Sequence, residues 1–264
     1  MAWWGWYPAN DGYNKGRDYA LKALSINNNI AEAHATLGGI TAYHDWNWGD
    51  FEKEFKLAIS LNPNYASAYK EYSELLDILG RNKEARELIN ISLRLNPHSF
   101  IINYVNAILY YHNTEYEKAI EASKEALEIS NNNAPMLTIL KCYINLGKNN
   151  EAIEHIRNII SINLSSNNNE LLDKIYQKSG IEGIVYWFID WLLLNESNEY
   201  INISIYEIAT FYAIIQDSQK AIEYLEKSFK ISEGTLPWIN NNSDFDILRT
   251  DPRFIALLSK MQLL

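Results

Sequence analysis

The side chains that could do chemistry in this sequence are few and widely spaced. Five histidines occur, and none has a second metal ligand at helical spacing, as an HExxH pattern would supply. They are His34, His44, His98, His112 and His155. We expect His34 to be packed and hydrogen-bonded, and His98 and His155 to lie on the surface. The single cysteine, Cys142, has no base or orienting partner at a recognisable spacing, and we expect it to be buried in a helix.

Other site chemistries also lack their sequence patterns. An Asn-rich run at 240–246 offers oxygen ligands but lacks the glycine and the distal glutamate of a calcium-binding loop. No glycine-rich phosphate-binding loop is present. One cysteine excludes a disulfide framework and a multi-cysteine metal site. The sequence therefore predicts no catalytic residue, no metal site, no cofactor and no enzymatic activity.

Composition narrows the class of protein and of partner. The chain has 264 residues, of which 47% are hydrophobic, so it is expected to fold. It has no run of about 20 apolar residues, so we expect no membrane insertion. A net charge of −10 with scattered basic residues argues against binding to nucleic acid. Residues 1–10 lack the pattern of a signal peptide, and we expect a cytoplasmic location. The alternative is the extracytoplasmic end of a membrane-anchored regulator.

The elements that position these side chains form an internal repeat. Equivalent segments end 34 or 35 residues apart, at Asn28, Pro63, Pro97 and Asn131. Alanines recur at similar intervals, at Ala85, Ala119, Ala152 and Ala221. Each alanine opens a run with apolar residues three and four apart, which predicts an amphipathic helix, and a second helical pattern precedes it. A large side chain where two such helices cross would overpack the contact and lower the stability of the fold by about 1–3 kcal/mol. One pair cannot bury its own apolar face, so neighbouring pairs must stack.

This pattern resembles the tetratricopeptide repeat. The resemblance implies an all-α fold: a right-handed superhelix of antiparallel helix pairs with a C-terminal capping helix. We interpret 1–264 as a single solenoid that begins with a partial repeat at 1–30 and ends with a cap at 233–264. The repeats between them lie at 31–65, 66–99, 100–133, 134–165, 166–198 and 199–232. The repeat at 166–198 is divergent, because Val185 stands where the others have alanine.

A narrower resemblance concerns three strings. They are similar to C-terminal repeat regions of bacterial regulators. The first string is AEAHATLG with the following YHDWNWGDFEKEFKLAISLNPNYASAY, the second is YQKSGIEGIVYWFIDWLL, and the third is DILRTDPRFIALLSKMQL. Such regulators often carry a winged-helix DNA-binding domain or a class III adenylate cyclase domain upstream, with a TolB-like domain between. The resemblance implies an interaction or sensory region of a signalling or transcription-regulatory protein, and it carries over no catalytic residue.

The last 30 residues predict a capping helix. Asp251 is a candidate N-cap, with Pro252 at the first helical position. One apolar face then follows, made of Phe254, Leu257, Leu258 and Met261. The alternative for this helix is a docking motif. We expect 235–244 to be an irregular bridge that leads to it.

The remaining candidate site is the concave surface that the first helix of each pair lines. The periodicity places a set of polar and aromatic residues there: Tyr43, Lys70, Glu74, Asp77, Tyr104, Ile108, Tyr111, His112 and Tyr206. It also places Glu71, Ile101, Thr138, Cys142, Asn145, Lys174, Lys178 and Thr210 on this face. Tyrosines give a large contact area at a low entropic cost, which favours recognition of a peptide. The alternative is that Tyr104, Ile108 and Tyr111 pack against neighbouring helices.

The sequence suggests three functional hypotheses, each placed on a different part of the chain. The first is a protein-interaction module that holds a segment of a protein partner in the concave groove. The second is a structural or oligomerisation domain, with a homodimer formed through an N-terminal patch of Trp3, Trp4 and Trp6. The third is a small-molecule sensory domain with a pocket at the divergent repeat.

Overall fold

The computed structural model describes residues 9–130, 132–163, 169–195 and 203–264. All regular elements in these ranges are helical, which confirms the all-α prediction. Trp3, Trp4 and Trp6 lie outside the described residues. The helices are α1 (Ala9–Ile26), α2 (Ala31–Tyr43), α3 (Phe51–Leu61), α4 (Ala66–Ile78), α5 (Asn82–Leu95), α6 (Phe100–His112), α7 (Tyr116–Ile129), α8 (Ala134–Asn145), α9 (Asn149–Asn163), α10 (Asn169–Leu194), α11 (Ile205–Ile214), α12 (Ser218–Lys230), η2 (Leu236–Asn240), η3 (Ser243–Leu248) and α13 (Pro252–Lys260).

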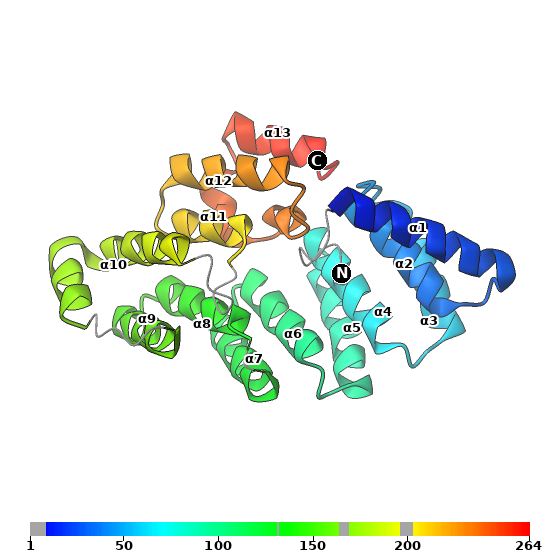
Figure 1. Cartoon of the computed structure of the whole chain (residues 1–264), viewed down its shortest axis with the longest axis horizontal. Helices are drawn as coiled ribbons and strands as arrows, with labels where there is room; N and C mark the ends of the chain where they lie inside the picture. The colour runs from blue at the N-terminus through cyan, green and yellow to red at the C-terminus, as the bar shows by residue number, and fades with distance from the viewer. Residues whose placement is uncertain (1–8, 131, 164–168, 196–202) are drawn as a thin grey trace.

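Consecutive helices pack as pairs, and the pairs stack side by side along a curved solenoid (Figure 1). The tight turns contain one residue with positive φ, and these residues are Gly80, Thr114, Gly147, Gly180 and Gln216. At the first of them, the Gly80 amide donates to the Asp77 carbonyl and the Arg81 amide donates to the Leu76 carbonyl, both at 2.8 Å. This pair of hydrogen bonds is a Schellman motif, which satisfies the last carbonyls of a helix and reverses the chain.

The long helix α10 is two helices joined at Gly180, where φ is 61° and ψ is −159°. The bend is visible at the left end of the solenoid in Figure 1. The helix that follows the bend packs through fully buried Ile184, Val185 and Phe188. Val185 therefore lies in the core, as the alanines of other pairs do.

Small residues sit where paired helices approach closely, as the repeat pattern predicts. A β-carbon built on Gly38 of α2 would lie 2.8 Å from ring carbons of Phe55 on α3. The recurring alanines Ala85, Ala119, Ala152 and Ala221 are at most 1% exposed. A larger residue at these places would force the two backbones apart.

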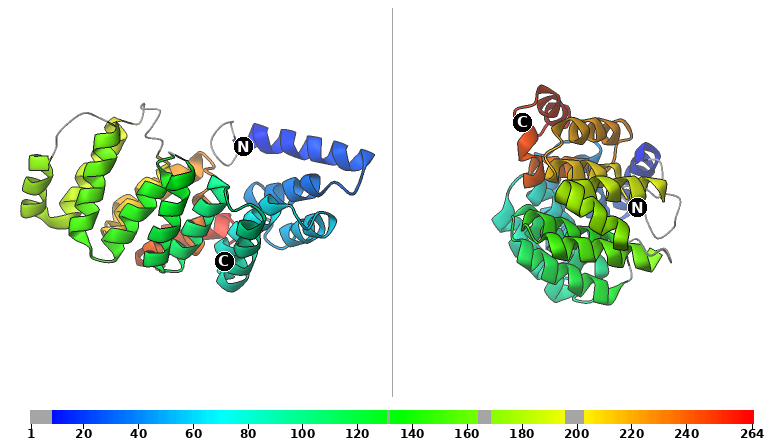
Figure 2. Two further views of the ribbon diagram at one scale, coloured as in Figure 1. Left: turned by 90° about the horizontal axis from the view of Figure 1, so that it is seen from below. Right: turned by 90° about the vertical axis from the view of Figure 1, so that its left-hand side faces the viewer.

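The solenoid curves until its two ends meet (Figures 1 and 2). Trp46, in the loop between α2 and α3, contacts Phe229 of α12 with ring centroids 5.8 Å apart. In the same loop, Trp48 Nε1 donates a 2.7 Å hydrogen bond to the Met261 carbonyl. The loop between α2 and α3 thus contacts residues near the C-terminal end of the described chain, and the Trp48–Met261 contact spans 213 residues.

The C-terminal segment confirms one expectation and corrects another. The Asp251 side chain accepts a hydrogen bond from the Arg253 amide and caps α13, with Pro252 at the first helical position, as predicted. Phe254, Leu257, Leu258 and Met261 are all buried, as predicted. The expected irregular bridge is wrong, because it contains the 3₁₀ helices η2 and η3. We call residues 235–248 the inner segment, since they enter the concave side of the solenoid (Figure 1).

Candidate binding groove

Eight of the nine predicted groove residues lie on the first helices of three pairs. Lys70, Glu74 and Asp77 lie on α4; Tyr104, Ile108, Tyr111 and His112 lie on α6; and Tyr206 lies on α11. All eight are buried, with exposures between 0% and 7%. The ninth, Tyr43, is half-buried at the end of α2. An open groove at these positions is therefore wrong for this conformation of the chain. Their role in binding a partner stays a prediction.

The inner segment covers much of this surface. Trp238 of η2 packs against the cluster of Tyr104, Ile108 and Ala126. Its ring meets the His112 ring edge-on, with centroids 5.5 Å apart. The physical reason for the burial is tertiary: a segment more than 100 residues away supplies the atoms that cover α6.

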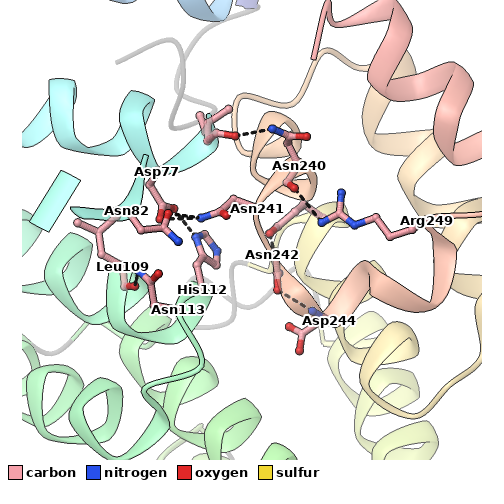
Figure 3. A network of polar contacts seen from close by, with 12 residues as sticks. Asp77, Asn82, Leu109, His112, Asn113, Asn240, Asn241, Asn242, Asp244 and Arg249 are labelled. Carbon is pink, nitrogen blue, oxygen red and sulfur yellow. Dashed lines mark hydrogen bonds and ion pairs between the residues drawn. The ribbon is translucent and has the colours of Figure 1, made fainter. Parts of the chain in front are cut away.

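The first polar node joins the inner segment to α4 and α6 (Figure 3). Asp77 is fully buried, and its Oδ2 lies 2.6 Å from His112 Nδ1. Asn241 Nδ2 donates to Asp77 Oδ1 at 3.0 Å and to Asn82 Oδ1 at 2.9 Å. Next to it, Asn240 Nδ2 donates to the Ile78 carbonyl at 2.7 Å. The buried carboxylate thus has a partner on each oxygen, which offsets the cost of removing it from water.

The second polar node joins the inner segment to α6, α8 and α11. Tyr111 donates its hydroxyl proton to Asp244 Oδ2, and Asn145 Nδ2 donates to Asp244 Oδ1 at 3.1 Å. Asn242 Nδ2 donates to the Tyr206 hydroxyl at 3.0 Å. Burial raises the pKa of the Asp244 carboxyl, against the opposing hydrogen bond from Tyr111. Burial, followed by the charge of Asp244, raises the pKa of the Tyr111 phenol well above its usual value.

Two ion pairs, each with a buried lysine, complete the concave surface. Lys141 Nζ lies 2.7 Å from Glu207 Oε2 and 4.9 Å from the centroid of the Tyr111 ring. Lys70 Nζ lies 2.8 Å from Glu74 Oε2, one helical turn away on α4. The periodicity missed Lys141 and Glu207, because each adjoins the position it assigned to the groove.

The inner segment itself was missed as part of the site. The sequence did carry a signal for it: the run Asn240 to Asp244 is flanked by Trp238-Ile239 on one side and by Phe245 on the other. Apolar residues on both sides of a short polar run are typical of a segment held at both ends. The sequence analysis predicts only an irregular bridge at 235–244 and finds no calcium-binding loop at 240–246.

The other candidate residues occupy structural positions. His34 is buried, with Nδ1 2.7 Å from Glu54 Oε2 and Nε2 3.0 Å from the Asn28 carbonyl, as predicted. Cys142 is fully buried, also as predicted, and burial raises its pKa to about 12. His98 is exposed, whereas His155 is half-buried and its Nε2 lies 2.9 Å from the Met136 carbonyl, so the surface prediction is wrong for it. Within the described ranges, no three potential metal-ligating side chains converge.

Two helix pairs of the solenoid are similar in sequence to a known protein family. Residues 136–166 and 204–235 match the family model described as tetratricopeptide repeat. These matches fall on the pairs α8–α9 and α11–α12. The fold is a tetratricopeptide-repeat solenoid. No match is found among curated protein sequences.

Three solved structures are among those similar to this chain. YrrB, described as a TPR protein with an unusual peptide-binding site, is 15% identical, with a TM-score of 0.46 over 83% of this chain and 95% of its own. PilW, a widely conserved type IV pilus biogenesis factor, is 13% identical, with a TM-score of 0.49 over 76% and 93%. PilF of Pseudomonas aeruginosa is 16% identical, with a TM-score of 0.48 over 84% and 96%. In the part of the chain that the structure describes, no helix is long and apolar enough to cross a bilayer.

Proposed function

We propose that this chain is a non-catalytic protein-interaction module whose concave groove binds a segment of a partner protein. One observation carries the proposal: the groove already holds a polar segment of the chain by side-chain hydrogen bonds. Asn241, Asn242 and Asp244 each pair with a groove side chain. The same donors and acceptors can bind a partner segment of similar chemistry when the inner segment leaves.

The energetics of the inner segment support such an exchange. Its buried apolar anchors are Leu236, Ile239, Phe245 and Leu248. Burying four such side chains contributes about 6–12 kcal/mol, and the groove hydrogen bonds contribute about 1 kcal/mol each. Ordering the backbone of this stretch costs about 1–2 kcal/mol per residue. Because this entropic cost offsets much of the free energy gained on docking, a partner segment that makes the same contacts can compete with the inner segment.

A direct test uses the inner segment as the probe. A fluorescein-labelled peptide of residues 235–250 is titrated into the full chain and into a Phe245→Ala variant. The wild-type groove is filled by its own segment at an effective concentration in the millimolar range, so it should bind little peptide. The variant leaves a large cavity under its own segment, which weakens docking, and it should bind the peptide saturably.

The matched control is Phe55→Ala, another fully buried phenylalanine that lies on α3, outside the groove. It should lower stability by a comparable amount and bind no peptide. The proposal fails if Phe245→Ala keeps its helical circular dichroism but binds no peptide at about 1 mM. If Phe245→Ala does not fold alone, addition of the peptide should restore its helical signal, and no restoration refutes the proposal.

We further propose that the module belongs to a bacterial signalling or transcription-regulatory protein. The support is the resemblance of the three strings to C-terminal regions of such regulators. The sequence of the complete gene tests this context directly. A winged-helix, cyclase or TolB-like domain before this region is the expected result, and a complete gene with none of them contradicts it.

A further inference from the structure

We infer that the partner segment carries two adjacent asparagines, then an aspartate two residues later, then an aromatic residue. This inference rests on the proposed function and names the chemistry of the segment that the groove binds. The inner segment has this pattern at 241–245. The hydrogen bonds that join it to both polar nodes use its side chains, from Asn240 to Asp244. Side-chain identity, more than backbone shape, therefore selects what the groove holds.

The first recognition site consists of two acceptors, Asp77 Oδ1 and Asn82 Oδ1, and we call it the amide site. Asn241 Nδ2 donates to them at 3.0 Å and 2.9 Å (Figure 3). A side-chain amide fits because its nitrogen carries two protons and no charge. A carboxylate would face the fully buried Asp77 carboxylate, and an apolar side chain would take a donor away from it. The amide site therefore selects an asparagine at the first position.

The second recognition site is the Tyr206 hydroxyl, on a buried side chain of α11. Asn242 Nδ2 donates to it at 3.0 Å. Asn242 Oδ1 accepts from the Asp244 backbone amide, also at 3.0 Å, and so shapes the turn that leads to the next polar position. An amide makes both bonds at once, whereas an apolar residue makes neither. Asparagine therefore fits the second position both as a ligand and as a turn former.

The third recognition site consists of two donors, the Tyr111 hydroxyl and Asn145 Nδ2, and we call it the carboxylate site. They donate to Oδ2 and Oδ1 of Asp244, respectively. A carboxylate offers one oxygen to each donor, whereas an amide would turn its N–H groups toward one of them. Burial raises the pKa of Asp244, whereas the hydrogen bond from Tyr111 and the charge of Lys141 favour its ionised form. The amide site and the carboxylate site thus have opposite demands, which fixes the direction of the bound segment.

An aromatic anchor completes the pattern. Phe245 is fully buried, and its ring centroid lies 5.7 Å from that of Tyr206. Aromatic side chains in closely packed, desolvated places contribute much of the affinity at many interfaces. Because Tyr206 contacts both Phe245 and Asn242, the anchor and the polar positions are held in one register. A partner segment with the same spacing can therefore satisfy all four positions together.

The test measures how well unlabelled peptides displace the fluorescein-labelled 235–250 peptide from the full-chain Phe245→Ala variant. A peptide with Asn241→Asp should compete about 10- to 150-fold more weakly than the native peptide, because it brings two carboxylates together. A peptide with Asp244→Asn should compete about 10-fold more weakly. The matched controls, Thr250→Asp and Asp246→Asn, make the same changes of charge at exposed positions and should compete within about twofold of the native peptide.

The outcomes separate this inference from the proposed function. Equal competition by the native, Asn241→Asp and Asp244→Asn peptides overturns the inference but leaves the proposed function standing, because the groove would then bind segments without regard to the pattern. No binding of the native peptide overturns both.

A charge exchange within the full chain tests the amide site without any peptide. Asn241→Asp alone should raise hydrogen–deuterium exchange of the backbone amides at 236–248 by about 10-fold or more. Adding Asp77→Asn should restore protection to within about threefold of the native chain. The introduced amide can donate to the introduced carboxylate, while its oxygen still accepts from His112. Equal exchange in the single Asn241→Asp variant and the double variant overturns the inference, and this measurement decides the question even if Phe245→Ala does not fold.

Discussion

Asn241 is the residue whose removal should most specifically loosen the inner segment. Its amide is the donor that reaches both Asp77 and Asn82 across more than 150 residues of sequence (Figure 3). A hydrogen bond to a charged acceptor contributes about 1.5–3 kcal/mol, and one to a neutral acceptor contributes about 0.5–1.5 kcal/mol. Asn241→Ala should therefore lower the docking free energy of the segment by about 2–4 kcal/mol.

Hydrogen–deuterium exchange with mass spectrometry measures this effect locally, which is necessary because repeat proteins do not always unfold in one step. Backbone amides at 236–248 should exchange about 30-fold to nearly 1,000-fold faster in the variant, since each 1.4 kcal/mol is a factor of ten. Asn90→Ala, an exposed asparagine on α5, is the control and should change exchange little.

A double-mutant cycle with Asn82→Ala isolates one of the two bonds. The coupling energy between Asn241 and Asn82 should be about 0.5–1.5 kcal/mol. The reasoning is refuted if Asn241→Ala accelerates exchange in the inner segment by less than about threefold. It is also refuted if exchange rises equally in α8 and α9, because the segment would then not open as a separate unit.

Three further predictions concern backbone strain, thiol reactivity and pH. Thr114 is an exposed β-branched residue with a φ of 60°, so Thr114→Gly should stabilise the chain by about 1 kcal/mol in urea denaturation. Gly147 also has a positive φ, and Gly147→Ala should destabilise the chain by a similar amount although there is open space around the added carbon. Stability changes of the same sign in the two variants would contradict the backbone strain argued for these turns. Cys142 should not react with a thiol reagent at pH 8 until denaturant is added, because burial raises its pKa to about 12; rapid reaction of the native chain would show the opposite. Burial raises the pKa of Asp244, so its favourable contribution to docking is complete below the ordinary value of 3.8 and is lost as pH rises through the raised value. Exchange protection at 236–248, corrected for intrinsic rates, should therefore fall as pH rises above the ordinary value of 3.8. Asp244→Asn should reduce that dependence, and an unchanged dependence in the variant would exclude Asp244 as its source.

The repeat architecture could be predicted from the sequence because its determinants are local. The alanines at regular intervals act within one helix pair, and the turns are set by residues next to the helix ends. Asp251 and Pro252 likewise specify the start of α13 from their own positions. Four residues that the periodicity assigned to the concave surface contact the inner segment, namely Asp77, Tyr111, His112 and Tyr206. The helix pairs and the assignment of their faces follow from the 3.6-residue helical period and need no knowledge of distant contacts.

Local sequence patterns were thus enough to predict the all-α solenoid, and they predicted a polar and aromatic surface on its concave side. The covering of this surface depends on tertiary structure, because the covering atoms come from the inner segment, whose hydrogen bonds to Tyr111 and Asp77 span 133 and 164 residues. The same holds for the meeting of the two solenoid ends, where Trp46 and Phe229 come together only because small rotations between successive pairs add up along the chain. A pattern within one repeat fixes the faces of its helices, but the accumulated curvature fixes which distant residues those faces meet.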